Sequence, residues 1–329
     1  MHHQFSEVIR SVQRAGLLGL VASVLPLGAQ QATGPRSWSW GPDDELGAAN
    51  QITSESILEA LAAVQKGDII ELSHEVVEGA PFIPGLQPEY KIGMHLTSPA
   101  TVEMFAEQFS ATNGIGINLE RIEMTTHVGT HIDAIGHISE ADTLYGGASG
   151  DETVSSSGLG HGGIEKAPPF IARAVLIDVA GYKNVQGLEA GYAITPEDLE
   201  GALKRQKSKV IEGAIVLIHT GADETFVSTP EEHAKSTPGI NLEAARWLSS
   251  RRVVAVGADN HAVEVEPGKI PGVAFPVHQH FITNQGVYMI ENMKLDELAE
   301  RRIYESTVII LPIKFKGATG SPVRVIALL

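Results

Sequence analysis

Short runs of apolar, β-branched residues recur along the chain and predict buried strands. Each run ends at polar or turn-forming residues and is too short for a typical helix, which favours strands. The predicted strands are Asp68–Val77, Ala174–Val179, Ala214–His219, Val253–Ala258, Val287–Ile290 and Thr307–Ile313. A Gly- and Ser-rich stretch, Gly146–Gly163, is predicted to be a long surface loop, and loops of that length are usually functional.

Between the strands, apolar residues recur at the spacing of a helix. The helices that this pattern predicts are Ser54–Gln65, Pro196–Gln206, Leu242–Arg251 and Leu295–Arg302. Thr53 or Ser54 can cap the first helix, and Thr195 followed by Pro196 is a typical start for the second. Long β segments with fewer helices indicate an α/β fold. We expect a single domain over residues 38–329, built around a mixed β-sheet with flanking helices.

Residues 1–32 differ from the rest of the chain and have the layout of a secretory signal. Arg10 and Arg14 precede an apolar run, Ala15–Ala29, which small and polar residues follow. The run is too short and too often interrupted by Gly and Pro to predict a membrane span. We therefore expect export to the periplasm or outside the cell, with cleavage near residues 29–32 and no membrane attachment afterwards. The alternative is an amphipathic N-terminal helix on a cytoplasmic protein.

Composition and charge narrow the functions open to the chain. Hydrophobic residues make up 43% and charged residues 19% of its 329 residues, which is typical of a globular protein. The net charge of −16 argues against nucleic acid and anionic lipid as partners, because both require basic faces. The sequence has no cysteine, so any metal must be held by histidine and carboxylate side chains.

The strongest chemical signal is the segment HVGTHIDAIGH, which runs from His127 to His137. Its potential ligands all occupy odd positions: His127, His131, Asp133 and His137. On an extended segment, residues of one parity share a face, so these side chains can converge on one point. A lone histidine is usually an ordinary core or surface residue. Three histidines and an aspartate within eleven residues instead favour a site for Zn²⁺ or Mn²⁺.

This segment resembles the HxGTHxDxPxH signature of the metal-dependent cyclase family, which includes bacterial kynurenine formamidase and isatin hydrolase. Further segments agree in order along nearly the whole chain after residue 38. They are WGPDDELGAANQIT at Trp40–Thr53, GAIVLIHTG at Gly213–Gly221, PGINLEAARWL at Pro238–Leu248, VVAVGADN at Val253–Asn260, GVYMIEN at Gly286–Asn292 and LPIKFKGATGSPVRVIAL at Leu311–Leu328. The resemblance implies a cyclase-like, metal-dependent hydrolase domain over residues 38–329.

The resemblance also implies a set of metal ligands. The residues that match the family's ligands are His127, His131, Asp133, His278 and Glu291. In this set Asp133 would bridge two metal positions. His280 is the alternative to His278, which we prefer because it follows a small apolar residue, as the family's histidine does. His137 matches the family's catalytic histidine.

Members of the family hydrolyse carbonyl–nitrogen bonds, often in a cyclic amide or an N-formyl group. The resemblance therefore implies a small-molecule substrate and one or two divalent ions, Zn²⁺ or Mn²⁺, per chain, which activate water and polarise the carbonyl. His137 would act as general base and acid. Ile135 and Ile138 depart from the proline and the aromatic residue usual there, so kynurenine formamidase activity does not follow from the motif alone. A homo-oligomer is expected because the family's sites often draw on a neighbouring subunit.

Outside this set, Asp259 and His161 are candidate substrate-binding residues. Asp259 follows a predicted strand and His161 lies in the Gly-rich stretch; a turn-capping aspartate and a solvated loop histidine are the alternatives. His261 is expected to be structural or to support the site from outside. The competing function is a non-catalytic, exported protein that binds a metal or a small molecule. A poised base at His137 argues against it.

Overall fold

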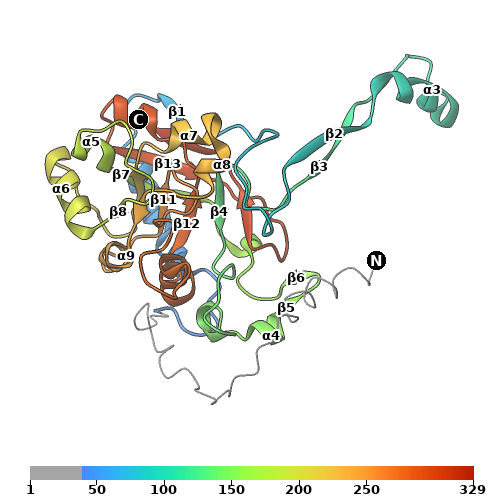
Figure 1. Ribbon diagram of the computed structural model, residues 1–329. Coiled ribbons are helices and arrows are strands. Elements are labelled where there is room, and N and C mark those ends of the chain that lie inside the picture. Colours follow the sequence, from blue (N-terminus) through green and yellow to red (C-terminus); the bar gives the residue numbers. More distant parts are fainter. Residues whose placement is uncertain (1–38) are drawn as a thin grey trace, which may run out of the picture. The chain divides into compact units, whose positions relative to one another are not determined.

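Nine strands form one mixed β-sheet in the computed structural model, which describes residues 39–329 (Figure 1). Their order is β1-β15-β13-β7-β9-β11-β12-β4-β14. Their bounds are β1 Ile69–Glu71, β4 His131–Asp133, β7 Phe170–Asp178, β9 Ile215–His219, β11 Ala255–Ala258, β12 Tyr288–Glu291, β13 Glu305–Ile310, β14 Gly320–Pro322 and β15 Val325–Leu328. The predicted α/β fold around a mixed sheet is confirmed. The predicted signal segment, residues 1–32, lies outside the described residues.

The centre of the sheet is parallel and buried on both faces. β7, β9, β11 and β12 run parallel to one another, and every residue of β9 is buried. Along β9, Ile215 and Leu217 pack into one core, whereas Val216 and Ile218 pack into the other. A strand that is buried on both faces has an almost continuous apolar sequence. The apolar runs therefore identified these strands correctly.

Helices cover both faces of this sheet, and all four predicted helices are present. α6 (Pro196–Gln206) and α9 (Leu242–Ser249) contribute to one core, and α11 (Asp296–Glu300) contributes to the other. α2 (Ser54–Ala62) contacts β7. α2 and α6 each begin after a threonine whose side chain forms a capping box. The caps are Thr53, one of the two that the sequence offered for the first helix, and Thr195, as predicted for the second.

The other helical segments and strands are short. They are η1 Gly47–Gln51, η2 Tyr145–Gly147, α4 Gly150–Thr153, β5 Val154–Ser155, β6 Gly158–Leu159, η3 Ile164–Lys166, α5 Val179–Lys183, β8 Ala193–Ile194, α7 Asp223–Ser228, α8 Pro230–His233, β10 Gly239–Ile240, α10 Pro276–His278 and η4 Gln279–Gln285. The predicted loop Gly146–Gly163 is thus replaced by a chain of short elements, beside which Tyr145 is fully buried. None of the helices within residues 39–329 has the length and apolar character that a membrane crossing requires.

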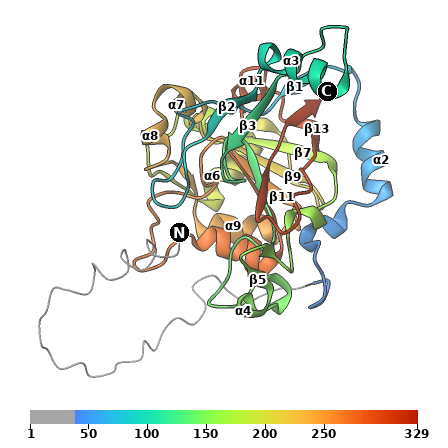
Figure 2. The ribbon, with the colours of Figure 1, turned by 90° about the vertical axis from the view of Figure 1, so that its right-hand side faces the viewer.

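A hairpin that the sequence did not predict extends from the sheet as an arm (Figure 1). It consists of β2 (Lys91–Leu96) and β3 (Leu119–Glu123), with α3 (Ser98–Phe109) between them. Figure 2 views the molecule from the side on which the arm extends. Nearly all residues of both strands are exposed. Because neither face is buried, the arm has no one-sided apolar period to reveal it.

The predicted strand Asp68–Val77 is longer than the observed β1, in which only Ile69–Glu71 pairs with β15. β1 is an edge strand, and pairing ends where the chain leaves its one neighbour. At the opposite edge, β4 lies between β12 and β14 in antiparallel pairs. β4 carries part of the histidine-rich segment, so this edge of the sheet positions the candidate site.

Candidate metal centre

Strand pairing at this edge brings together residues that are far apart in the sequence. In the antiparallel pair of β4 and β12, His131 lies directly opposite Glu291, and Asp133 lies opposite Met289. His131 and Asp133 share a face of β4, because side chains alternate along a strand. On the other side of β4, Gly320 of β14 lies opposite Asp133. A Cβ at Gly320 would lie 2.7 Å from Cε1 of His127, so glycine leaves the space that this ring fills.

The side chains meet in two groups that share Asp133. In the first, Nδ1 of His127 lies 2.8 Å from Oδ1 of Asp133. In the second, Glu291 lies between two histidines, with Oε2 3.2 Å from Nε2 of His131 and Oε1 3.0 Å from Nε2 of His278. Asp133 also lies 3.7 Å from Nε2 of His131 and 3.8 Å from Nε2 of His278. The structure therefore brings all the predicted ligands together.

These donors satisfy the geometric requirement for a divalent cation. The ligand atoms of His127, Asp133 and His137 lie within 4.8 Å of one another, as do those of Asp133, His278 and Glu291. Neither buried oxygen of Asp133 accepts a well-formed hydrogen bond from residues 39–329, although His127 is close enough for an ion pair. A buried carboxylate normally has such partners, so a cation would complete this environment. Imidazole and carboxylate ligands suit Zn²⁺ and Mn²⁺.

Electrostatics at the site favour positive charge. Burial raises the pKa of Glu291, but hydrogen bonds from His131 and His278 outweigh it and hold the pKa well below its usual value. Burial likewise disfavours the cation of His131, yet Glu291 and Asp133 raise its pKa to about 9. The carboxylates thus stabilise a proton on a buried imidazole. The same negative charge would stabilise a divalent ion, with the imidazoles neutral.

The structure distinguishes between the two histidines of the PVHQHF segment. His278 ends α10, and its Nδ1 lies 2.6 Å from Oε1 of Glu264, which leaves Nε2 facing Glu291 and Asp133. His280 lies outside the cluster, with Nε2 2.9 Å from the hydroxyl of Ser249. A carboxylate behind a metal-binding histidine fixes its ring orientation and raises its basicity. No motif in the sequence indicated this role for Glu264.

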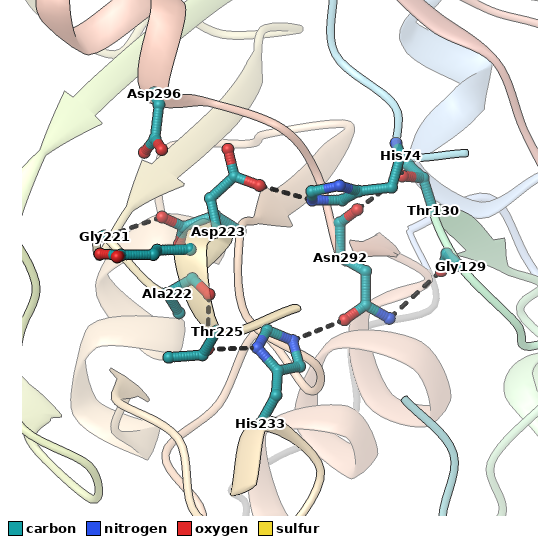
Figure 3. Close-up of polar contacts among 12 residues, drawn as sticks. His74, Gly129, Thr130, Gly221, Ala222, Asp223, Thr225, His233, Asn292 and Asp296 are labelled. Atoms are coloured by element: carbon teal, nitrogen blue, oxygen red, sulfur yellow. Dashed lines mark hydrogen bonds and ion pairs between the residues drawn. The ribbon is translucent and has the colours of Figure 1, made fainter. Parts of the chain in front are cut away.

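A second set of polar contacts supports His131 from behind. Nδ1 of His131 donates to the carbonyl oxygen of Gly129 at 2.9 Å, which orients Nε2 toward the carboxylates. The side-chain amide of Asn292 donates to the same carbonyl, and Oδ1 of Asn292 lies 2.9 Å from Nε2 of His233 (Figure 3). Thr130 donates to the backbone carbonyl of Asn292. Asn292, the residue after Glu291, is therefore held through both its side chain and its backbone.

His137 lies beside His127, and their rings stack with centroids 4.2 Å apart. Burial lowers the pKa of His137 to about 4, and the nearby charge of Asp133 only partly opposes this shift. The imidazole is therefore uncharged at neutral pH and able to accept a proton. Its ring also lies within ligand distance of His127 and Asp133, so metal binding and base catalysis are both geometrically open to it.

A cavity of about 320 Å³ opens onto these residues. One part of its wall is apolar and comes from Pro81, Ile83, Leu86, Ile138 and Phe275. The rest of the wall includes His127, His131, His137, His278 and Glu291, together with Gln87, Thr125, His261, Ala262 and Asn292. None of these lining residues is Lys or Arg, so the cavity offers no lysine or arginine side chain to a charged substrate group.

The two predicted substrate-binding residues do not line this cavity. Asp259 is fully buried and accepts hydrogen bonds from the backbone amides of Thr220 and Gly221. The Asp259 side chain therefore stabilises a turn. Nε2 of His161 lies 3.1 Å from the carbonyl oxygen of Tyr145. His261, expected to be structural or to support the site from outside, lines the cavity. The available signal was its place just after a parallel strand, where ligands often bind in α/β folds.

The described residues also contain a separate group of acidic residues around His219 at the end of β9. Its Nδ1 lies 2.7 Å from Asp178 and its Nε2 lies 3.0 Å from Asp296. Burial opposes the imidazolium, but these hydrogen bonds raise the pKa of His219 to about 10. These contacts form an ion-pair network in which His219 and Asp178 are largely buried and Asp296 is partly exposed.

Known proteins resemble this chain in sequence and in fold. A crystal structure described as a novel cyclase is 31% identical, with a TM-score of 0.79, over 90% of this chain and 98% of the other. Kynurenine formamidase from Bordetella petrii is 25% identical over 67% of this chain and 84% of its own length. Isatin hydrolase A from Labrenzia aggregata, 23% identical with a TM-score of 0.57 over 83% of this chain and 97% of its own, shares the fold.

The family model described as "Putative cyclase" matches residues 70–265, which is more than half of the 329-residue chain. This match includes the histidine-rich segment on β4. The chain therefore belongs to the cyclase family.

Proposed function

We propose that this protein is a metal-dependent hydrolase that cleaves the carbonyl–nitrogen bond of a small cyclic amide, an N-formyl amide or a related lactone. One observation carries the proposal. Two histidine–carboxylate groups that share Asp133 converge at one end of a cavity, next to the uncharged imidazole of His137. The relationship to kynurenine formamidase supports it, because that enzyme hydrolyses an amide.

The metal would be held by His127, His131, Asp133, His278 and Glu291. When bound, a divalent ion supplies Lewis acidity, which makes water more acidic and polarises a carbonyl oxygen. His137 accepts a proton from the attacking water and returns it to the leaving nitrogen, which becomes an amine. We propose Zn²⁺ or Mn²⁺ as the ion, with one or two per chain, since Asp133 belongs to both groups of ligands.

The cavity favours an uncharged substrate over an amino acid derivative. Its apolar wall suits a ring, and a volume of about 320 Å³ suits a small molecule. No lysine or arginine among the lining residues can pair with a substrate carboxylate. We therefore place neutral cyclic amides ahead of N-formylkynurenine, which carries both an ammonium and a carboxylate group.

Turnover distinguishes this proposal from a non-catalytic, exported binding protein. The protein is loaded with Zn²⁺ or Mn²⁺ and assayed against isatin, other neutral lactams, a lactone and N-formylkynurenine, with and without chelator. We expect chelator-sensitive hydrolysis, fastest on a neutral cyclic amide. Metal-loaded protein without activity toward any of these compounds would contradict the hydrolase proposal and support the binding protein.

Two further proposals concern the location and the oligomeric state of the protein. Residues 1–32 alone support export to the periplasm or outside the cell. The arm supports a homo-oligomer, because β2 and β3 expose apolar residues and the segments at its base contribute Gln87 and Thr125 to the cavity. A second copy of this chain would bury this surface. It would also cover the cavity beside the base of the arm.

A further inference from the structure

His261 occupies the cavity near the candidate metal ligands without belonging to their groups. It follows β11 and lines the cavity together with His131, His278 and Glu291. The charges of these three residues act on its ring. No nitrogen of His261 is among the ligand atoms that cluster within 4.8 Å. The ring is therefore close enough to meet a molecule bound at the ligands, but not placed as a ligand itself.

The hydrogen-bonding capacity of His261 is unused in the described part of the chain. Other polar residues of the cavity wall already have hydrogen-bond partners. The side chain of Gln87 donates to the carbonyl oxygen of His127 and accepts from the backbone amide of Ile83. The amide of Asn292 is likewise occupied at both ends. Within residues 39–329, the His261 ring makes no hydrogen bond or ion pair, and it contacts the His233 ring at a centroid distance of 6.4 Å.

The charge state of this ring is defined by its surroundings. Burial lowers the pKa of His261 to about 4, and the nearby charge of Glu291 opposes the shift only in part. The ring is therefore neutral near pH 7, with one nitrogen that donates and one that accepts a hydrogen bond. His137 is also neutral but lies next to His127, whereas His261 lies next to His233. Each of these two cavity-lining imidazoles thus packs against a different histidine ring.

We propose that His261 is a substrate-contacting specificity residue, whose ring hydrogen-bonds a neutral oxygen, a carbonyl or hydroxyl, beside the carbonyl that is hydrolysed. This inference rests on the proposed function. We take the oxygen to be neutral because the cavity lining offers no lysine or arginine side chain to an anionic one. A site with an unpaired hydrogen-bonding group discriminates against analogues that leave the group unpaired. His261 therefore favours dicarbonyl or hydroxylated lactams over simple ones.

The test compares two lactams of the same ring system. Isatin has a second carbonyl beside its amide carbonyl, and oxindole has a methylene there. Wild-type protein, His261→Leu and His261→Gln are loaded with the same metal. Metal content, KM and kcat for isatin, and the Kd of oxindole by calorimetry are measured for each. His261→Gln retains a donor and an acceptor, and melting curves verify that every variant is folded.

We expect His261→Leu to raise KM for isatin about tenfold, which corresponds to a hydrogen bond of ~1.4 kcal/mol. Its metal content and its Kd for oxindole should stay at the wild-type values, and His261→Gln should restore most of the loss. An unchanged KM in His261→Leu would overturn the inference, as would a parallel loss of metal, which would make His261 a ligand. A metal-loaded wild type that does not hydrolyse isatin would overturn the proposed substrate class and this inference with it.

Discussion

His131 and Glu291 face each other across the β4–β12 strand pair, with Nε2 of His131 3.2 Å from Oε2 of Glu291. The two residues are far apart in the sequence, and the antiparallel register of β4 and β12 brings them together. The same register places Asp133 on the face of β4 that His131 uses. Three of the candidate ligands, His131, Asp133 and Glu291, thus lie on strands, which hold ligands more rigidly than loops do.

Replacement of His137 tests its role as the base. His137→Ala should lower kcat roughly 10²–10⁴-fold, the usual contribution of a general acid–base group, with metal content unchanged. Activity and bound metal are measured on the same sample. If bound metal falls while turnover per bound ion is unchanged, His137 is a ligand and another group must be the base. His280→Gln is the matched control, since His280 lies outside the cluster.

Asn292 should control metal affinity through His131. Its amide nitrogen and Nδ1 of His131 both donate to the Gly129 carbonyl. Figure 3 shows the contacts of Asn292 with Gly129 and His233. Asn292→Ala removes this support and should weaken metal binding about 10–100-fold, as is typical for groups behind a metal ligand. Affinity is measured by competition with a chromophoric chelator.

The control for this experiment is a variant that loses folding stability at another place in the fold, the start of α9. Asn241 caps α9 by accepting a hydrogen bond from the amide of Ala244. Asn241→Ala should cost about 1 kcal/mol of folding stability and leave metal affinity unchanged. Equal metal affinities in Asn292→Ala and wild type would show that the contact does not position His131.

The arm should mediate self-association. Ile92 and Ile122 are cross-strand partners, and 47% and 49% of their surfaces are exposed. Ile92→Glu combined with Ile122→Glu would place two like charges on this surface and should dissociate the oligomer. Light scattering coupled to size exclusion measures the mass. Lys91→Ala is a control on the same strand; a monomeric wild type, or an oligomer that survives the double substitution, would refute the proposal.

The His219 network should make stability depend on pH. Burial opposes the charge, but Asp178 and Asp296 raise the pKa of His219 to about 10 in the folded state. In the unfolded chain it is near ~6.5, so the folded state binds the extra proton between these values. The stabilisation is complete below about pH 6.5 and is lost as pH rises toward 10.

Urea denaturation of wild type and His219→Asn at pH 6 and pH 9.5 measures this effect. Wild type should lose on the order of 2–4 kcal/mol more than the variant over this interval, after allowance for the partly exposed Asp296. Parallel changes in the two proteins would show that His219 is neutral in the folded state.

The sequence predicted most of the central sheet because β9 and its neighbours are buried on both faces and are almost uniformly apolar. It also predicted that His131 and Asp133 would share a face, since they lie two residues apart on β4. The prediction of one extended segment from His127 to His137 was wrong, because β4 covers only His131–Asp133. His127 and His137 lie in the bends on either side of β4 and still come close to Asp133. The arm was not predicted because its strands are exposed on both faces. Glu264 and His261 were not predicted as parts of the site, because their roles depend on how the segment after β11 folds against β12 and α10.

Plasma mass spectrometry of the purified protein measures directly whether Asp133 and its neighbours bind a metal. Wild type and His280→Gln should each carry one or two equivalents of Zn or Mn, and Asp133→Asn should lose most of it, because Asp133 belongs to both ligand groups. A wild-type protein that contains no metal as purified, and takes up none on incubation with Zn²⁺ or Mn²⁺, would show that these residues do not form a metal site.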